Sequence, residues 1–172
     1  YLDCDTYVAS KGGILDLFSV VEEYDVAGSI DSGRKLGSSR GIEPVPDELQ
    51  SIPDAFSWIN TGVVAYKKKN NVLQFINNWE QNHEEFRSNL GLEELNDQAA
   101  FRYALYHSDL RHATLPPEYN FRTPWPQSVR GRVHILHGED SNMPDIEKVV
   151  NSDDENTSWR QFNTLSFPDG TR

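Results

Sequence analysis

Apolar and polar positions change their spacing twice within the first thirty residues. The short apolar lead of residues 1–2 runs into the polar segment 3–6, a pattern typical of the carboxyl end of a parallel strand. Apolar residues then recur at three- and four-residue steps over residues 14–21 and predict a short helix. Residues 24–30 predict a buried strand that ends at Asp31. A strand, a helix and a second strand in this order predict a parallel sheet.

The central part of the chain predicts a loop, a strand and two helices. Residues 32–54 are rich in Gly, Ser and Pro, lack periodicity, and predict a long loop that either binds a ligand or is disordered. Residues 56–66 predict a strand interrupted by the polar segment 60–62. Apolar side chains at helical spacing over residues 72–86 predict a core-packing helix, and a further helix is expected over residues 95–107.

Beyond the helix predicted over residues 95–107, the sequence predicts one more strand and then becomes polar. Residues 132–138 alternate as a strand, and residues 144–150 predict a short helix. The polar residues that follow are typical of a tail or a link to another part. We therefore expect a domain over residues 1–143 and a polar C-terminal tail or linker over residues 144–172.

Composition narrows the class of protein. The chain has 172 residues, of which 37% are apolar and 25% charged, so it is long and apolar enough for one globular core. The net charge of −11 argues against a nucleic-acid surface and against adhesion to anionic membranes. No apolar run approaches the roughly 20 residues of a membrane span. The cations of the predicted loop either face a phosphate or only improve solubility; they are Arg34, Lys35 and Arg40.

The single cysteine bears on the cellular location of the protein, and the first residue bears on whether the chain is part of a longer protein. Cys4 alone excludes an intrachain disulfide, which suits a reducing compartment, so a cytoplasmic location is expected. Because Tyr1 is not an initiator methionine and stands at the tail of a predicted strand, we expect the chain to be part of a longer protein. A secretory-pathway lumen is the alternative if a membrane anchor precedes Tyr1 in that protein.

Candidate metal ligands stand at the two ends of the predicted domain. Asp3 and Asp5, one residue apart on an extended segment, would point the same way and offer the hard oxygen ligands that Mg²⁺ and Mn²⁺ prefer. His134 and His137 end the last predicted strand, and a neutral imidazole is a suitable ligand for a transition metal such as Mn²⁺. Solvated Asp-x-Asp turns and structural histidines are also common, and that interpretation stays open here.

Two other polar segments are candidates for ligand contact. The Asn-Thr-Gly segment at residues 60–62 places a glycine inside a strand, which marks either the close approach of a ligand or a structural bulge. Asn96 is a candidate N-cap, with Asp97 and Gln98 in the first turn of the next helix. The same position would let a carboxylate and an amide point into a pocket.

Five motifs follow one another along the chain. They are Leu-Asp-Cys-Asp-Thr at 2–6, Asn-Thr-Gly-Val-Val at 60–64, Asn-Asp-Gln-Ala-Ala at 96–100, Leu-Pro-Pro-Glu-Tyr-Asn-Phe-Arg at 115–122 and Ile-Leu-His-Gly at 135–138. In this order the chain resembles the nucleotide-diphospho-sugar transferases of the GT-A fold, above all the glycogenin-like and LgtC-like, family 8-related glycosyltransferases. The resemblance covers residues 1–138 and implies an α/β fold whose mixed, mostly parallel sheet is flanked by helices. It also implies that the nucleotide-binding half of the fold precedes Tyr1 and is missing here, so the isolated chain is expected to have little or no activity.

The resemblance implies a metal site. Asp3 and Asp5 match the Asp-x-Asp motif that holds Mn²⁺ or Mg²⁺ against the diphosphate of a nucleotide sugar. His137, or failing that His134, matches the late histidine that completes this site.

The resemblance also implies donor contacts. Asn60, Thr61 and Gly62 match the strand that lines the donor-sugar pocket, and Asp97 and Gln98 match the pair that contacts the sugar near its reacting carbon. One feature departs from the family, because many relatives place a Lys or Arg after the late His-Gly where this chain has Glu139 and Asp140. Contact with the diphosphate is then expected from another cation, and the candidates are Arg122, Arg130 and Arg132.

These features favour a metal-dependent glycosyltransferase of the hexosyltransferase type. It would move a sugar from a nucleotide-diphosphate sugar to a carbohydrate, glycan or protein acceptor, with retention of configuration. A haloacid-dehalogenase-type phosphatase is an alternative, because it also opens with Asp-x-Asp and Asp153-Asp154 imitates its late acidic pair, although Tyr7 stands where such enzymes have Thr or Val. A non-catalytic sugar-binding or scaffold domain is the other alternative.

Overall fold

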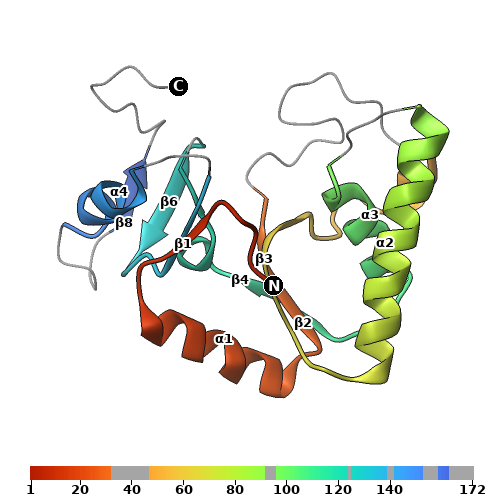
Figure 1. Ribbon diagram of the computed structural model, residues 1–172, viewed down its shortest axis with the longest axis horizontal. Helices are drawn as coiled ribbons and strands as arrows, with labels where there is room; N and C mark the ends of the chain where they lie inside the picture. The colour runs from red at the N-terminus through yellow and green to blue at the C-terminus, as the bar shows by residue number, and fades with distance from the viewer. Residues whose placement is uncertain (32–46, 92–95, 124, 139–141, 153–158, 163–172) are drawn as a thin grey trace.

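The computed structural model describes residues 1–31, 47–91, 96–123, 125–138, 142–152 and 159–162. These residues form a mixed α/β fold of small sheets and helices (Figure 1). Several residues singled out in the sequence lie outside the described part of the chain: Arg34, Lys35, Arg40, Glu139, Asp140, Asp153 and Asp154.

The first sheet lies at the centre of the molecule and has the order β3-β2-β4. Its middle strand β2 (Val26–Ile30) pairs antiparallel with β3 (Ile59–Tyr66) and parallel with β4 (His112–Leu115). The first four residues of β2 and the first six of β3 are all buried. Continuous burial of this kind shows that both faces of these strands are covered.

The second sheet has the order β1-β7-β5. Strand β7 (Ile135–His137) is central, with β1 (Thr6–Val8) antiparallel on one side and β5 (Phe121–Arg122) parallel on the other. Next to it, β6 (Gln127–Arg130) and β8 (Trp159–Phe162) form an antiparallel pair.

The predicted strand–helix–strand unit does not give a parallel pair. Strand β1 pairs with β7, which comes late in the chain, and β2 pairs with β3 and β4. The expectation of one mostly parallel sheet is therefore wrong for the described residues, which form small mixed sheets instead. The helix and the second strand form where they were predicted, as α1 and β2, whereas β4, β5, β6 and β8 were not predicted. The pairing of the strands depends on contacts far apart in the sequence.

Residues 1–3 join the two three-stranded sheets. Leu2 forms an antiparallel bridge with Val63 of β3, the Asp3 N–H donates to the Gly62 carbonyl at 2.9 Å, and the Tyr1 carbonyl accepts from the Val64 N–H at 3.1 Å. The chain then turns and enters β1. The segment with the two aspartates thus lies at the seam between the sheets, near the centre of the molecule (Figure 1).

Three helices cover the first sheet. Helix α1 (Lys11–Glu23) begins after Ser10, whose hydroxyl accepts from the Gly13 N–H, and buries Leu17 and Val21. The long helix α2 (Asn70–Leu90) and α3 (Gln98–Tyr106) pack together on the other side of the molecule (Figure 1). Their apolar faces form a core cluster with the sheet; its buried members are Val26, Ile59, Val64, Val72, Phe75, Phe101, Ala104, Leu105 and Leu110.

The segment expected to be a polar tail contributes to a second core cluster. Helix α4 (Met143–Val150) buries Ile146 and Val150, and Phe162 of β8 packs on the same cluster. The guanidinium of Arg160 donates to the carbonyls of Val150 and Gly131. Packing therefore continues past residue 143 through α4 and β8. Two short 3-10 helices complete the described elements, Asp47–Ser51 and Pro117–Tyr119.

Candidate metal centre

The two aspartates lie on a tight turn and not on an extended strand. The Thr6 N–H and hydroxyl both donate to the Asp3 carbonyl, at 3.2 and 2.7 Å, and close the turn. Asp3 Oδ1 accepts from the Cys4 N–H at 3.0 Å. The predicted extended geometry is therefore wrong, because Thr6 offers two donors that favour the turn. Both carboxylates remain partly exposed at the seam between the sheets.

His137 reaches the aspartates through the pairing of β1 with β7. Thr6 lies opposite His137 in that pair, and the Gly138 N–H donates to the Asp5 carbonyl at 3.0 Å. His137 Nε2 lies 3.2 Å from Asp5 Oδ1, and ligand atoms of Asp3, Asp5 and His137 all lie within 4.8 Å of one another. We call these three residues the DDH cluster.

His134 lies elsewhere. Its ring stacks on Tyr119, with the centroids 4.9 Å apart and the planes 30° from parallel. It also covers Gly13 of α1, where an added Cβ would meet the His134 Cβ at 2.4 Å. Of the two candidate histidines, the structure brings His137 to the aspartates and gives His134 a packing contact.

Gly62 makes room for the His137 ring. A Cβ at residue 62 would lie 2.0 Å from His137 Cε1 and 2.3 Å from Nδ1, closer than any real contact. The glycine in β3 therefore allows the close approach of a side chain of the protein itself, not of a ligand. The register of β3 against β2 shifts between the pairs Gly28–Val64 and Ile30–Ile59, which supports the alternative interpretation of a structural bulge at residues 60–62. The absence of a side chain at Gly62 lets His137 lie directly on the strand.

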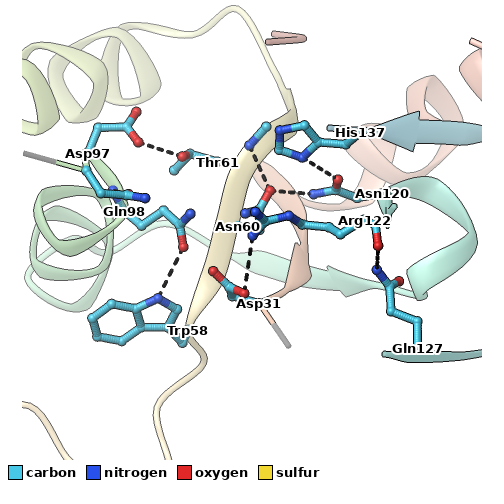
Figure 2. Close-up of polar contacts among 12 residues, drawn as sticks. Asp31, Trp58, Asn60, Thr61, Asp97, Gln98, Asn120, Arg122, Gln127 and His137 are labelled. Carbon is cyan, nitrogen blue, oxygen red and sulfur yellow. Dashed lines mark hydrogen bonds and ion pairs between the residues drawn. The ribbon is translucent and has the colours of Figure 1, made fainter. Parts of the chain in front are cut away.

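Two buried asparagines stand behind the imidazole (Figure 2). Asn120 Oδ1 lies 2.9 Å from His137 Nδ1, and Asn120 Nδ2 donates to Asn60 Oδ1 at 2.8 Å. Asn60 Oδ1 also accepts from the Gly62 N–H at 3.0 Å. Asn60 is 1% exposed, so the amide that the resemblance assigns to a sugar pocket lies behind the DDH cluster.

Burial lowers the pKa of His137, and the neighbouring Arg122 acts in the same direction, while Asp5 opposes it. The imidazole is therefore favoured in its neutral form, which is the form that ligates metals. Asp5 Oδ1 is buried, and its contact with Nε2 does not have hydrogen-bond geometry, so this oxygen accepts no hydrogen bond from the described residues.

The DDH cluster fits a divalent cation in donor chemistry and spacing. Adjacent ligands of an octahedral ion with bonds of about 2.1 Å lie about 3.0 Å apart, and opposite ligands about 4.2 Å apart. The separation of 3.2 Å between Asp5 and His137 matches the first value. The limit of 4.8 Å for the whole cluster exceeds the second, so the carboxylates would have to close by up to about 0.6 Å around such an ion. The buried Asp5 oxygen without a hydrogen bond is the atom that such an ion would satisfy.

Asp97 and Gln98 form a second group on the other side of β3 (Figure 2). The Thr61 hydroxyl donates to Asp97 Oδ1 at 2.7 Å, and Trp58 Nε1 donates to Gln98 Oε1 at 3.3 Å. Burial raises the pKa of Asp97, and the hydrogen bond from Thr61 partly offsets this. Among the described residues, no hydrogen bond joins this group to the DDH cluster. Asn96, the expected cap, accepts from the Gln98 N–H at 2.8 Å.

Arg122 lies beside the DDH cluster on β5. Its Nη1 is 3.5 Å from Asp31 Oδ1, and its guanidinium lies 5.9 Å from the centroid of the Trp125 ring. Its Nε is buried and has no hydrogen-bond partner in the described part of the chain. Arg122 therefore places a positive charge next to the candidate metal ligands.

Sequence reasoning did not single out Asn120 or Asp31 as site residues. Asn120 stands between two aromatic residues, Tyr119 and Phe121, in the motif at residues 115–122, from which only Arg122 was proposed as a site residue. A polar side chain enclosed by aromatic neighbours signals a buried amide that needs hydrogen-bond partners. That signal was present in the sequence.

Two further findings concern membrane spans and similarity to known proteins. No helix within the described residues is long and apolar enough to cross a membrane. Neither the models of known protein families nor the curated proteins give a match to this chain. The geometry of the site is therefore the basis for a function.

Proposed function

We propose that this protein is a metal-dependent glycosyltransferase with part of a GT-A fold, which moves a sugar from a nucleotide-diphosphate sugar to a carbohydrate, glycan or protein acceptor with retention of configuration. The convergence of Asp3, Asp5 and His137 is the observation that carries the proposal. These residues come from opposite ends of the described chain, and the pairing of β1 with β7 brings them together. The five sequence motifs supply the resemblance to this class of enzyme.

Asp3, Asp5 and His137 would hold the ion, Mn²⁺ or Mg²⁺. A bound divalent ion supplies positive charge to the departing diphosphate. Such charge is needed because the chain carries a net charge of −11 and would otherwise repel an anionic donor. Arg122 adds a cation next to His137, and its positive charge would favour a phosphate group there.

The residues across β3 would act on the sugar. The Thr61 hydroxyl fixes the Asp97 carboxylate, and Trp58 fixes the Gln98 amide, so both polar groups are oriented before a ligand arrives. A fixed carboxylate stabilises the positive charge that develops at the reacting carbon of the sugar. Gly62 and Asn60, which the resemblance also assigns to the donor pocket, would act through the position of His137.

The first test measures Mn²⁺ binding by thermal denaturation. Mn²⁺ at 100 times its Kd should raise the melting temperature by roughly 5–10 °C. Asp5→Asn should abolish this shift, because it removes a charged ligand while keeping the size of the side chain. Asp109→Asn removes the same charge from an exposed position before β4 and should keep the shift. A wild-type protein with no Mn²⁺ shift, or an Asp5→Asn variant with the full shift, contradicts the proposal.

The second test measures the reaction in the full gene product. A panel of nucleotide sugars with Mn²⁺ should release a nucleoside diphosphate, and Asp5→Asn should lower the rate by at least about a hundredfold. Release of inorganic phosphate from simple phosphoesters would favour a phosphatase instead. Sugar binding without release of a nucleoside diphosphate would favour a non-catalytic binding domain.

A further inference from the structure

A chain of hydrogen bonds runs from the backbone of β3 to the imidazole of His137. It begins at the Gly62 N–H, passes through the side chains of Asn60 and Asn120, and ends at His137 Nδ1. Its three links measure 3.0, 2.8 and 2.9 Å. Figure 2 shows the links from Asn60 to Asn120 and from Asn120 to the His137 ring as dashed lines.

The direction of every link follows from the first one. A backbone N–H can only donate, so the Asn60 atom that faces Gly62 must be the carbonyl oxygen. The same oxygen faces Asn120, which must therefore present its NH₂ group there and its own oxygen to His137. His137 Nδ1 then has to carry a proton, because it faces an acceptor.

Burial prevents the chain from reversing. Asn60 is 1% exposed, Asn120 3% and His137 6%, so water cannot take the place of a lost partner. Turning either amide over would set two donors or two acceptors against each other. A buried polar group left unsatisfied in this way costs about 1–3 kcal/mol.

The other ring nitrogen is the one that faces the aspartates. In a neutral imidazole with a proton on Nδ1, Nε2 carries none and presents a lone pair. That lone pair lies 3.2 Å from Asp5 Oδ1, a buried oxygen that accepts no hydrogen bond from the described residues. Two electron-rich atoms at this separation call for a cation between them.

We propose that Asn120 is a positioning residue that holds His137 in the Nδ1–H tautomer and so presents Nε2, together with Asp5 and Asp3, to a divalent cation. The role of Asn120 in metal binding rests on the proposed function. The Nδ1–H tautomer of His137 does not, because it follows from the hydrogen bonds alone. A hydrogen bond to the outer nitrogen of a metal-ligating histidine orients the ring and typically changes metal affinity 10–100-fold. Asn60, which accepts from the Gly62 N–H, fixes which end of the Asn120 amide faces His137.

The experiment begins with the metal-free full-length protein labelled with ¹⁵N-histidine. Long-range ¹H–¹⁵N spectra at about pH 8, above the ordinary histidine pKa of about 6.5, identify which ring nitrogen bears the proton. The wild-type His137 should show the Nδ1–H pattern. An Nε2–H pattern in the wild type overturns the inference, whatever the metal does.

The variant Asn120→Leu removes the acceptor and keeps a side chain of similar size. His137 then loses the acceptor that holds its proton on Nδ1 and should shift toward the Nε2–H form, and the affinity for Mn²⁺ alone, measured by calorimetry, should fall 10–100-fold. Gln127→Leu is the matched control, because Gln127 donates to the Arg122 carbonyl and takes no part in the chain. It should keep both the Nδ1–H pattern and the Mn²⁺ affinity.

The metal-free spectrum of the wild type keeps the inference testable even if Asn120→Leu does not fold, because it needs no variant. Unchanged Mn²⁺ affinity in a folded Asn120→Leu variant overturns the inference. Failure of the wild type to bind Mn²⁺ refutes the proposed function, while the metal-free spectrum still decides the tautomer.

Discussion

The variant Gly62→Ala tests the close contact between β3 and the His137 ring. The added methyl group would lie 2.0 Å from His137 Cε1 and 2.3 Å from Nδ1. The ring is 6% exposed and is held by Asn120, so it cannot move aside without losing that hydrogen bond. Overpacking costs about 1–3 kcal/mol and the lost bond about 1 kcal/mol.

Together these costs lower the free energy of unfolding by roughly 2–4 kcal/mol, which corresponds to a fall in melting temperature of roughly 5–15 °C for a chain of this size. Thermal denaturation followed by circular dichroism measures this fall. Gly12→Ala is the control, because the nearest atom to its added Cβ is Ser10 Oγ at 3.5 Å. Gly12 lies in α1, where alanine is favoured, so its melting temperature should stay the same or rise.

A double variant isolates the contact itself. In a His137→Ala background the ring is gone, and Gly62→Ala should cost less than about 1 kcal/mol. The difference between the two backgrounds is the coupling energy of the pair, expected at about 1–3 kcal/mol. A Gly62→Ala variant that melts with the wild type, or a coupling energy near zero, would refute the close packing of His137 on β3.

Two further predictions concern titrating groups. The Lys69 side chain and the Arg111 N–H hold the pKa of Asp25 below its ordinary value of 3.8, so the stability that this carboxylate contributes is present above pH 3.8 and is lost as the pH falls through its lowered pKa. In acid denaturation, the stability gap between the wild type and Asp25→Asn should therefore shrink below about pH 3.8, and a gap that stays constant would contradict this. Burial raises the pKa of Asp97, so its ionised form costs stability at neutral pH and this cost disappears as the pH falls through the raised pKa. Asp97→Asn should raise the melting temperature at pH 7 and lose this advantage in acid, while a lower melting temperature at pH 7 would show that the charge is stabilising.

Helices were predictable because their signal is local. The apolar steps over residues 14–21 and 72–86 each describe one face of a helix, and α1 and α2 contain these segments. Strand pairing is not local in this way. The partner of β1 is decided by Leu136 and Ile135, which face Tyr7 and Val8 from the far end of the chain.

The residue types of the candidate DDH cluster were predictable, whereas its geometry was not. Asp3, Asp5 and His137 were candidates by residue type, but the choice between His134 and His137 needed the sheet, because both end the same predicted strand. Asp3 and Asp5 were expected on an extended strand, whereas Thr6 closes a turn there. Asn120 was missed because its role depends on Asn60, with which it shares no sequence pattern.

The pairing of β1 with β7 has a consequence for synthesis of the chain. Asp3 and Asp5 are synthesised before His137, whose strand follows only after β2, β3, β4 and helices α1, α2 and α3 have been made. Strand pairs that close over such long stretches of chain form slowly, because the entropy of the loop is lost before the contacts are gained. Until then the edge of β1 has no partner from β7 and is exposed to pairing with other chains. Completion of the DDH cluster therefore marks the point at which this edge is covered.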